Sequence, residues 1–93
     1  MRLIFFDEKE IVNEENMVFC IFYYLTAEES QNEPYCENYG LFVELFCDRQ
    51  QKEAELIKGI TPSFTEINEI ALAISRNTVT PSTLKEVVIE YIS

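Results

Sequence analysis

The sequence predicts an α+β domain, in which a four-stranded antiparallel meander is followed by two helices packed on one face of the sheet. Residues 1–60 hold stretches rich in β-branched and aromatic residues, separated by polar turn residues. Residues 61–93 instead repeat apolar residues at helical spacing. Strands followed by helices, without β–α–β alternation, are typical of α+β folds. The chain has 93 residues and only two glycines, so a single domain over residues 1–93 is expected.

The first two strands are predicted at residues 2–12 and 17–26. In the first, apolar segments flank a charged stretch, which suits an edge strand, and residues 13–16 would close a hairpin. The second contains the longest apolar run of the chain, whose aromatic and β-branched residues favour a strand with both faces covered. Side chains alternate along a strand, so one set is expected to point into the core and the next residues to the opposite face. The core set is Met17, Phe19, Ile21, Tyr23 and Leu25, and the opposite set is Val18, Cys20, Phe22 and Tyr24.

After a turn-rich loop at residues 31–36, the third strand is predicted at 38–48 and a shorter fourth strand at 53–59. In the third strand Leu41, Val43 and Leu45 share one face, while Phe42, Glu44 and Phe46 share the other. A buried carboxylate without a partner is costly. The face that carries Glu44 should therefore be the less enclosed one.

Helices are predicted at residues 64–76 and 81–92. Ser63 and Glu66 form the capping-box pattern at the start of the first helix, and Asn77 is expected to end it in a left-handed conformation. The second helix should begin with Thr80 as its N-cap and a proline at its first position, where the missing N–H costs nothing.

The charge and the cysteines restrict the partners and the compartment. A net charge of −10 repels phosphate backbones and anionic membranes and would suit a basic partner, although acidity also serves solubility alone. No export segment is visible, and the nine-residue apolar run is too short to span a bilayer as a helix. The three cysteines, Cys20, Cys36 and Cys47, form no CxxC pair. The sequence therefore predicts a cytoplasmic protein with three thiols and with no bound metal or cofactor.

Catalytic constellations are missing from the sequence. The chain has no histidine, so a Ser-His-Asp or Cys-His arrangement is excluded, and it has no glycine-rich phosphate loop. The paired acids at 14–15 and 28–29 fall in predicted turns, where solvated loop residues are the simpler interpretation. No catalytic, cofactor-binding or metal-binding residue is assigned.

Four aromatic side chains form the candidate interface. If the helices cover one face of the sheet, an apolar patch remains on the other face, and such patches commonly mark interaction sites. A homodimer or a protein partner would cover it. Loops or sheet curvature could cover it instead, and a register shift by one residue would reverse the faces. The candidate residues are Phe22, Tyr24, Phe42 and Phe46.

The segment from Ser75 to Ile92, with Tyr23-Tyr24 and Tyr39-Gly40, resembles a group of short proteins of Clostridia-type Gram-positive bacteria that form a domain-of-unknown-function family. The shared pattern is an early Tyr-rich strand, a Tyr-Gly strand, a helix and an Arg-Asn-x-Val-Thr-Pro-x-x-Leu string, here residues 76–84. The resemblance implies no activity. The string itself is explained as a helix stop and restart.

The leading hypothesis is a non-catalytic interaction or regulatory module that acts through the sheet face or an edge strand. The alternative is a small enzyme or ligand-binding protein that uses carboxylate and Tyr groups in a pocket between sheet and helices. A third possibility, an acidic mimic of nucleic acid, ranks last because the acids are spread over the whole sequence. RNA binding by the aromatic strands is disfavoured for lack of basic residues.

Overall fold

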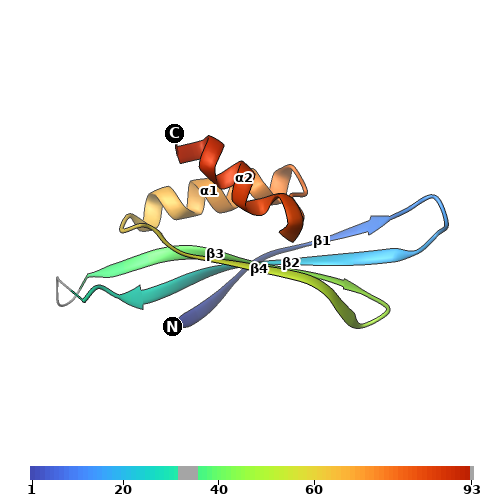
Figure 1. Cartoon of the computed structure of the whole chain (residues 1–93), viewed down its shortest axis with the longest axis horizontal. Coiled ribbons are helices and arrows are strands. Elements are labelled where there is room, and N and C mark those ends of the chain that lie inside the picture. Colours follow the sequence, from blue (N-terminus) through green and yellow to red (C-terminus); the bar gives the residue numbers. More distant parts are fainter. Residues whose placement is uncertain (32–35, 93) are drawn as a thin grey trace.

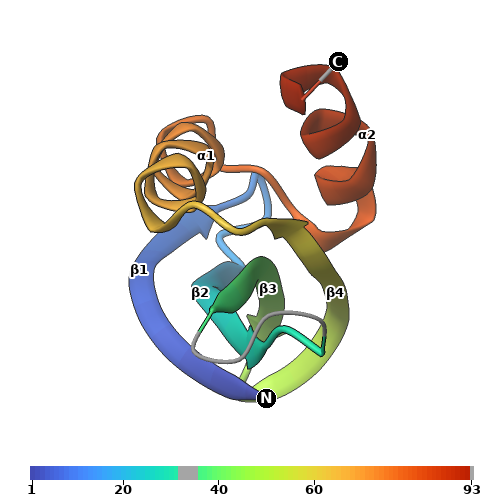
Figure 2. The same cartoon turned by 90° about the vertical axis from the view of Figure 1, so that its left-hand side faces the viewer.

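In a computed structural model of the chain, which describes residues 1–31 and 36–92, a four-stranded sheet carries two helices on one face (Figure 1). The strands are β1 (Arg2–Val12), β2 (Val18–Glu29), β3 (Glu37–Cys47) and β4 (Gln50–Thr61), and the helices are α1 (Phe64–Arg76) and α2 (Pro81–Ile92). The strands pair antiparallel in the order β1-β2-β3-β4. Viewed along the sheet, α1 and α2 lie above the same face (Figure 2). The predicted fold class is confirmed.

Both helices and β1 begin and end at the residues that the sequence predicts, and β3 has the predicted length but starts one residue earlier, whereas β2 and β4 are longer than predicted. β2 continues to Glu29, and β4 has 12 residues, so the prediction of a shorter fourth strand was wrong. The reason is the turn between β3 and β4: Asp48 and Arg49 have φ of 51° and 64°. Two left-handed residues match the twist of a two-residue hairpin, so pairing resumes at once at Gln50. Most of the predicted 31–36 loop lies outside the described residues.

The core lies between the sheet and the helices. The inward side chains of β2 and β3 are those that the alternation predicts, with Ile21, Tyr23, Leu25, Leu41 and Val43 buried. The helices bury Ile67, Ile70 and Ile74 of α1 and Leu84 and Val88 of α2 against them. The buried Tyr23 hydroxyl donates to the Val79 carbonyl oxygen at 2.8 Å, which ties β2 to the segment between the helices.

Met17 corrects the predicted core. It is 39% exposed and lies outside strand β2. The reason is visible in Figure 1, where the β1–β2 hairpin extends well beyond the end of the helix layer. Alternation identifies a face of the sheet, but how far along the strands the helices cover that face depends on tertiary structure.

The start of α1 is capped as predicted, through one additional residue. The Ser63 hydroxyl accepts the Glu66 N–H at 3.1 Å. In the described structure the Glu66 carboxylate does not accept the Ser63 N–H. It accepts a hydrogen bond from the Thr61 hydroxyl, and the Thr61 hydroxyl oxygen in turn accepts the Ser63 N–H. The end of α1 differs from the prediction. Asn77 has φ of −90°, and Thr78, with φ of 51°, takes the left-handed position.

The loop after α1 is closed by a Schellman-type pair of hydrogen bonds. The Val79 N–H donates to the Ile74 carbonyl oxygen, and the Thr78 N–H donates to that of Ser75. α2 then starts at Pro81 as predicted. The Thr80 hydroxyl, however, lies 3.2 Å from the hydroxyl oxygen of Ser82. The backbone carbonyl oxygen of Thr80 accepts the Thr83 N–H.

One end of the sheet is shaped by Gly40. An added Cβ there would clash with the Ile57 carbonyl oxygen and would lie 2.7 Å from the Thr26 hydroxyl. The close approach arises because residues 58–60 of β4 bulge between the pairs Tyr39–Thr61 and Leu41–Ile57. Gly59 in this bulge has φ of 62°. Glycine at position 40 therefore permits the bulge to fold against the sheet.

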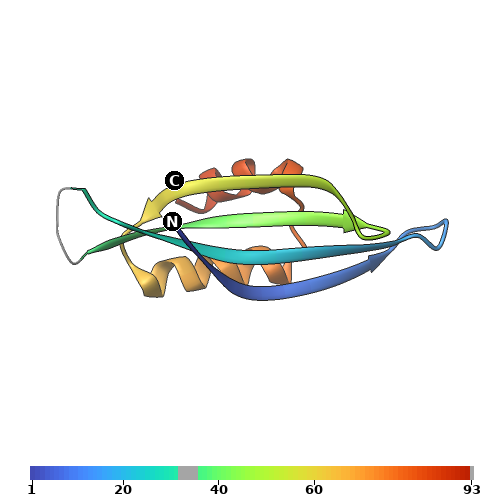
Figure 3. The ribbon, with the colours of Figure 1, turned by 90° about the horizontal axis from the view of Figure 1, so that it is seen from below.

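The molecule is elongated, with principal extents of 50 × 26 × 17 Å. Seen from below, the four strands lie in front of both helices (Figure 3). Within residues 1–31 and 36–92, therefore, no helix lies over the sheet face opposite α1 and α2, which we call the outer face. No helix in the described part of the chain is long and apolar enough to cross a membrane.

Candidate interface on the outer sheet face

The outer face carries an apolar row that crosses all four strands. Phe5 of β1 faces Tyr24 of β2, Tyr24 faces Phe42 of β3, and Phe42 faces Leu56 of β4. We call these four residues the apolar row. In the next row along the strands, Glu8 faces Phe22, which faces Glu44. The row after that pairs Glu10 with Cys20 and Cys20 with Phe46.

The four aromatic residues predicted from the sequence are all on this face, and they contact one another. Phe22 and Phe46 meet edge to face with ring centroids 5.5 Å apart, and the centroids of Tyr24 and Phe42 are 5.7 Å apart. Such pairs stabilise by about 0.5–1.5 kcal/mol beyond the area they bury. All four side chains are half-buried, since the rings shield one another. They lie outside the core of the chain, and their role as an interface stays a prediction.

Two further members of the patch were missed by the sequence analysis. Phe5 is 58% exposed and packs edge to face on Tyr24, with ring centroids 5.7 Å apart. Its place depends on a bulge between Phe5 and Asp7, which strand periodicity does not reveal. Leu56 is 36% exposed. A second irregularity, between Leu45 and Phe46, brings Leu56 opposite Phe42.

Beside the apolar row lies a surface hollow of about 440 Å³. Side chains of β2 and β3 line it, together with Asp48 and Arg49 of the β3–β4 turn. Its polar groups are the Tyr24 phenol, the Glu44 and Asp48 carboxylates and the Arg49 guanidinium. The residues that line it are Val18, Cys20, Phe22, Tyr24, Glu44, Phe46, Asp48 and Arg49.

Glu44 is a half-buried carboxylate among aromatic rings. It accepts a hydrogen bond from the Gln51 side-chain amide at 2.8 Å. Burial raises the pKa of Tyr24, and the neighbouring Glu44 carboxylate raises it further by its charge and by accepting a hydrogen bond. In the described part of the chain the ion pairs join Arg2 to Glu37 and Lys9 to Asp7. Within that part of the chain, Glu44 forms no ion pair with a Lys or Arg side chain.

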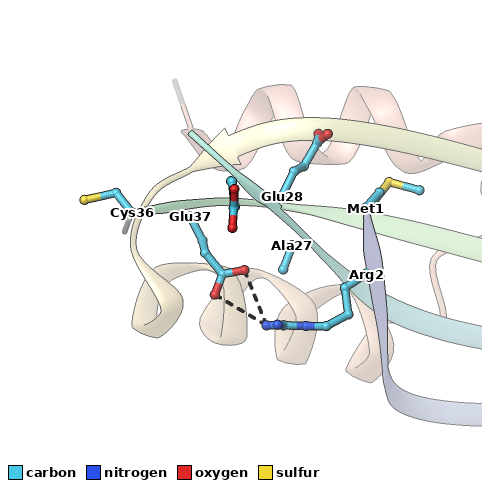
Figure 4. A pocket seen from close by; sticks show the side chains of 7 residues that line it. Met1, Arg2, Ala27, Glu28, Cys36 and Glu37 are labelled. Atoms are coloured by element: carbon cyan, nitrogen blue, oxygen red, sulfur yellow. Dashed lines mark hydrogen bonds and ion pairs between the residues drawn. The ribbon is translucent and has the colours of Figure 1, made fainter. Parts of the chain in front are cut away.

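A second hollow, of about 420 Å³, lies at the end of the sheet that carries the N-terminus (Figure 4). The Arg2 guanidinium pairs there with the Glu37 carboxylate at 3.4 Å. Figure 4 shows the Glu28 carboxylate and the Cys36 thiol pointing away from this pair. Apart from the Arg2–Glu37 pair, the polar side chains labelled in Figure 4 do not point toward one another.

The interior between sheet and helices is filled by apolar side chains. The buried phenol there, Tyr23, is held by Val79. Burial, with the nearby Asp7 charge, raises the pKa of Tyr23 to about 12. The sequence analysis gave, as an alternative, a pocket between sheet and helices that holds carboxylate and Tyr groups. The Tyr that shares a hollow with a carboxylate is instead Tyr24, which lies beside Glu44 on the outer face. In the described residues, no group of three or more His, Cys, Asp or Glu side chains is placed to hold a metal ion.

Comparison with known families places the chain. A model described as a family of unknown function (DUF6514) matches residues 2–93. The chain belongs to the DUF6514 family. No curated protein and no solved structure is significantly similar to it.

Membership in DUF6514 indicates no function. The helix stop and restart at residues 76–84 lies on the other side of the sheet. There Val79 accepts the Tyr23 hydrogen bond and Leu84 is buried in the core. In this chain the string therefore has a structural role and does not contribute to the outer face.

Proposed function

We propose that this chain is a non-catalytic protein-interaction module, acting in the cytoplasm, whose outer sheet face binds another polypeptide. The observation that supports the proposal is the apolar row of Phe5, Tyr24, Phe42 and Leu56 on a face that no described helix covers. The core on the opposite face already contains the apolar stripes of both helices. The aromatic rings of the outer face therefore lie outside the core that the sheet and the helices form.

Burial of this row by a partner would be favourable. Removing apolar surface from water contributes roughly 25 cal/mol per Å², of which association entropy takes a large part. Aromatic side chains near the centre of a patch contribute most to protein–protein affinity. Phe5, more than half exposed, and Phe42, at the middle of the row, are the residues whose truncation should weaken binding most.

The Tyr24–Glu44 pair does not favour the enzyme alternative. The Tyr24 phenol is a hydrogen-bond donor to Glu44, and the upward shift moves its pKa further from neutral pH. General bases and nucleophiles need the opposite adjustment, toward the operating pH. The pair therefore suits recognition of a ligand better than proton transfer.

Photo-crosslinking in the native host cell tests the proposal. A photoreactive phenylalanine analogue at position 42 should give a discrete covalent adduct. The same analogue at Leu72, which is 43% exposed on α1, serves as the matched control. Adducts of equal yield at both positions, or none at position 42, would contradict the proposed function. Light scattering on the purified chain then shows whether the adduct partner is a second copy.

A further inference from the structure

From the charges that border the outer face, we infer that its occupant is a cationic amphipathic helix of another protein, which lays apolar side chains on the aromatic rings and sets Lys or Arg against the carboxylates. This inference rests on the proposed function, since it specifies the partner of the same face.

The carboxylates surround the rings in a regular way. Phe22 lies between Glu8 on β1 and Glu44 on β3, its two cross-strand neighbours. Glu10 follows one row further along β1, and Asp48 lines the hollow. Among the residues that line the hollow, the cation is Arg49. The surface is thus an apolar patch with a negative border.

Glu44 is the residue that most restricts which partner can cover the outer face. Covering the rings would take this half-buried carboxylate fully out of water, and Gln51 and the Tyr24 phenol are neutral donors. A buried charge without an opposite charge is strongly destabilising. The occupant therefore has to bring a Lys or Arg to Glu44.

A second copy of the chain is poorly suited to place a Lys or Arg against Glu44. Face-to-face packing about a two-fold axis would bring the Glu8, Glu10 and Glu44 carboxylates of two copies into one interface. Each copy also carries a net charge of −10. Polyanions are repelled for the same reason. Charge complementarity instead favours a basic partner.

The geometry of the patch suits a helix. Four strands about 4.8 Å apart give the apolar row a length of roughly 14 Å, close to three turns of an α-helix at about 5.4 Å per turn. The opposite face of the same sheet already packs α1 and α2 through side chains three and four residues apart, such as Ile67, Ile70 and Ile74. A partner helix would complete a helix–sheet–helix sandwich.

Model peptides test the charge requirement. The probe is a labelled amphipathic peptide of Leu and Lys only, about four helical turns long, with a Leu and Glu peptide of the same pattern as control. Fluorescence anisotropy should show binding of the Lys peptide alone. Glu44→Gln should weaken it about three- to tenfold, whereas Glu86→Gln, the same charge change on the exposed side of α2, should change it less than about twofold.

The site of binding is checked by substitutions in the rings and by a thiol. Phe42→Ser should weaken binding of the Lys peptide about tenfold or more, and Leu56→Ser, at the sheet edge, serves if the first variant does not fold. Leu72→Ser on α1 is the control and should bind normally. Cys20, which lines the hollow, should become less reactive toward a thiol reagent when the Lys peptide is bound, and the exposed Cys36 should not.

Several outcomes would overturn the inference. They are failure of the Lys peptide to bind, equal loss in Glu44→Gln and Glu86→Gln, and equal binding of the Glu peptide. The crosslink at position 42 distinguishes failure of the cationic-helix inference from failure of the proposed function. An adduct with a second copy, or with a partner that has no cationic amphipathic helix, refutes the inference and leaves the module intact. No adduct at position 42 refutes both.

Discussion

Replacing Tyr23 by phenylalanine should destabilise the chain by about 2 kcal/mol. The Tyr23 side chain is fully buried, and its hydroxyl donates to the Val79 carbonyl oxygen at 2.8 Å. The substitution removes a net stabilisation of about 0.5–1.5 kcal/mol and leaves a buried acceptor, which costs about 1–3 kcal/mol. For a domain of this size, 1 kcal/mol shifts the melting temperature by about 4–8 °C.

The same residue makes stability depend on pH above the neutral range. The pKa of Tyr23 is raised to about 12 in the folded chain, against about 10 in an unfolded one. The unfolded state therefore loses its proton first as pH rises. The stabilisation is fully present below pH 10 and is lost between about pH 10 and 12, by roughly 1.4 kcal/mol per pH unit at most.

Urea unfolding, followed at pH 8 and at several points up to pH 12, measures both effects. The difference in free energy of unfolding between the wild type and Tyr23→Phe should shrink as pH rises through this window. Tyr91→Phe, on the exposed part of α2, is the control and should stay within about 0.5 kcal/mol of the wild type. A cost below about 0.5 kcal/mol for Tyr23→Phe, or a difference that stays constant up to pH 12, would show that the Tyr23 hydroxyl does not stabilise the fold in this way.

Three further substitutions test local features of the fold by the same urea assay. Thr78→Gly should stabilise by about 0.5–1 kcal/mol, because Thr78 has φ of 51° and glycine adopts that conformation freely; a loss of stability would contradict this. Gly40→Ala should destabilise by about 1–3 kcal/mol through its clash with the Ile57 carbonyl oxygen, and an unchanged midpoint would show that the bulge of β4 gives way. Thr80→Ala should cost only about 0.5 kcal/mol, the low end for a helix cap, since the Thr80 hydroxyl contacts the Ser82 hydroxyl; a cost near 2 kcal/mol would mean that it caps a backbone N–H after all.

The parts of the fold that sequence predicts well are those set by local chemistry. Ser63 and Pro81 place the starts of the two helices because caps and proline act within one turn. The position of Glu44 among apolar residues identifies which face of β3 the helices leave uncovered, because an unpaired buried charge is costly. These inferences need no knowledge of distant residues.

The parts that sequence does not predict depend on pairing between strands. The bulge at Phe5–Asp7 aligns Phe5 with Tyr24, and the irregularity next to Phe46 aligns Leu56 with Phe42. A shift of one residue in register exchanges the two faces of a strand. Both outer members of the apolar row were therefore missed, while Tyr24 and Phe42 on the central strands were found.

The stability of Phe42→Ser separates two explanations of the outer rings. If the rings serve folding, losing a half-buried Phe that contacts Tyr24 should cost as much as a core truncation, about 3–5 kcal/mol. If they serve binding, the free chain should lose no more than about 1–2 kcal/mol, since the Phe42 ring is already partly in water. A small loss of stability together with a large loss of binding is the result expected of residues that a partner covers. The same comparison at Leu72, exposed on the helix side, should show neither loss.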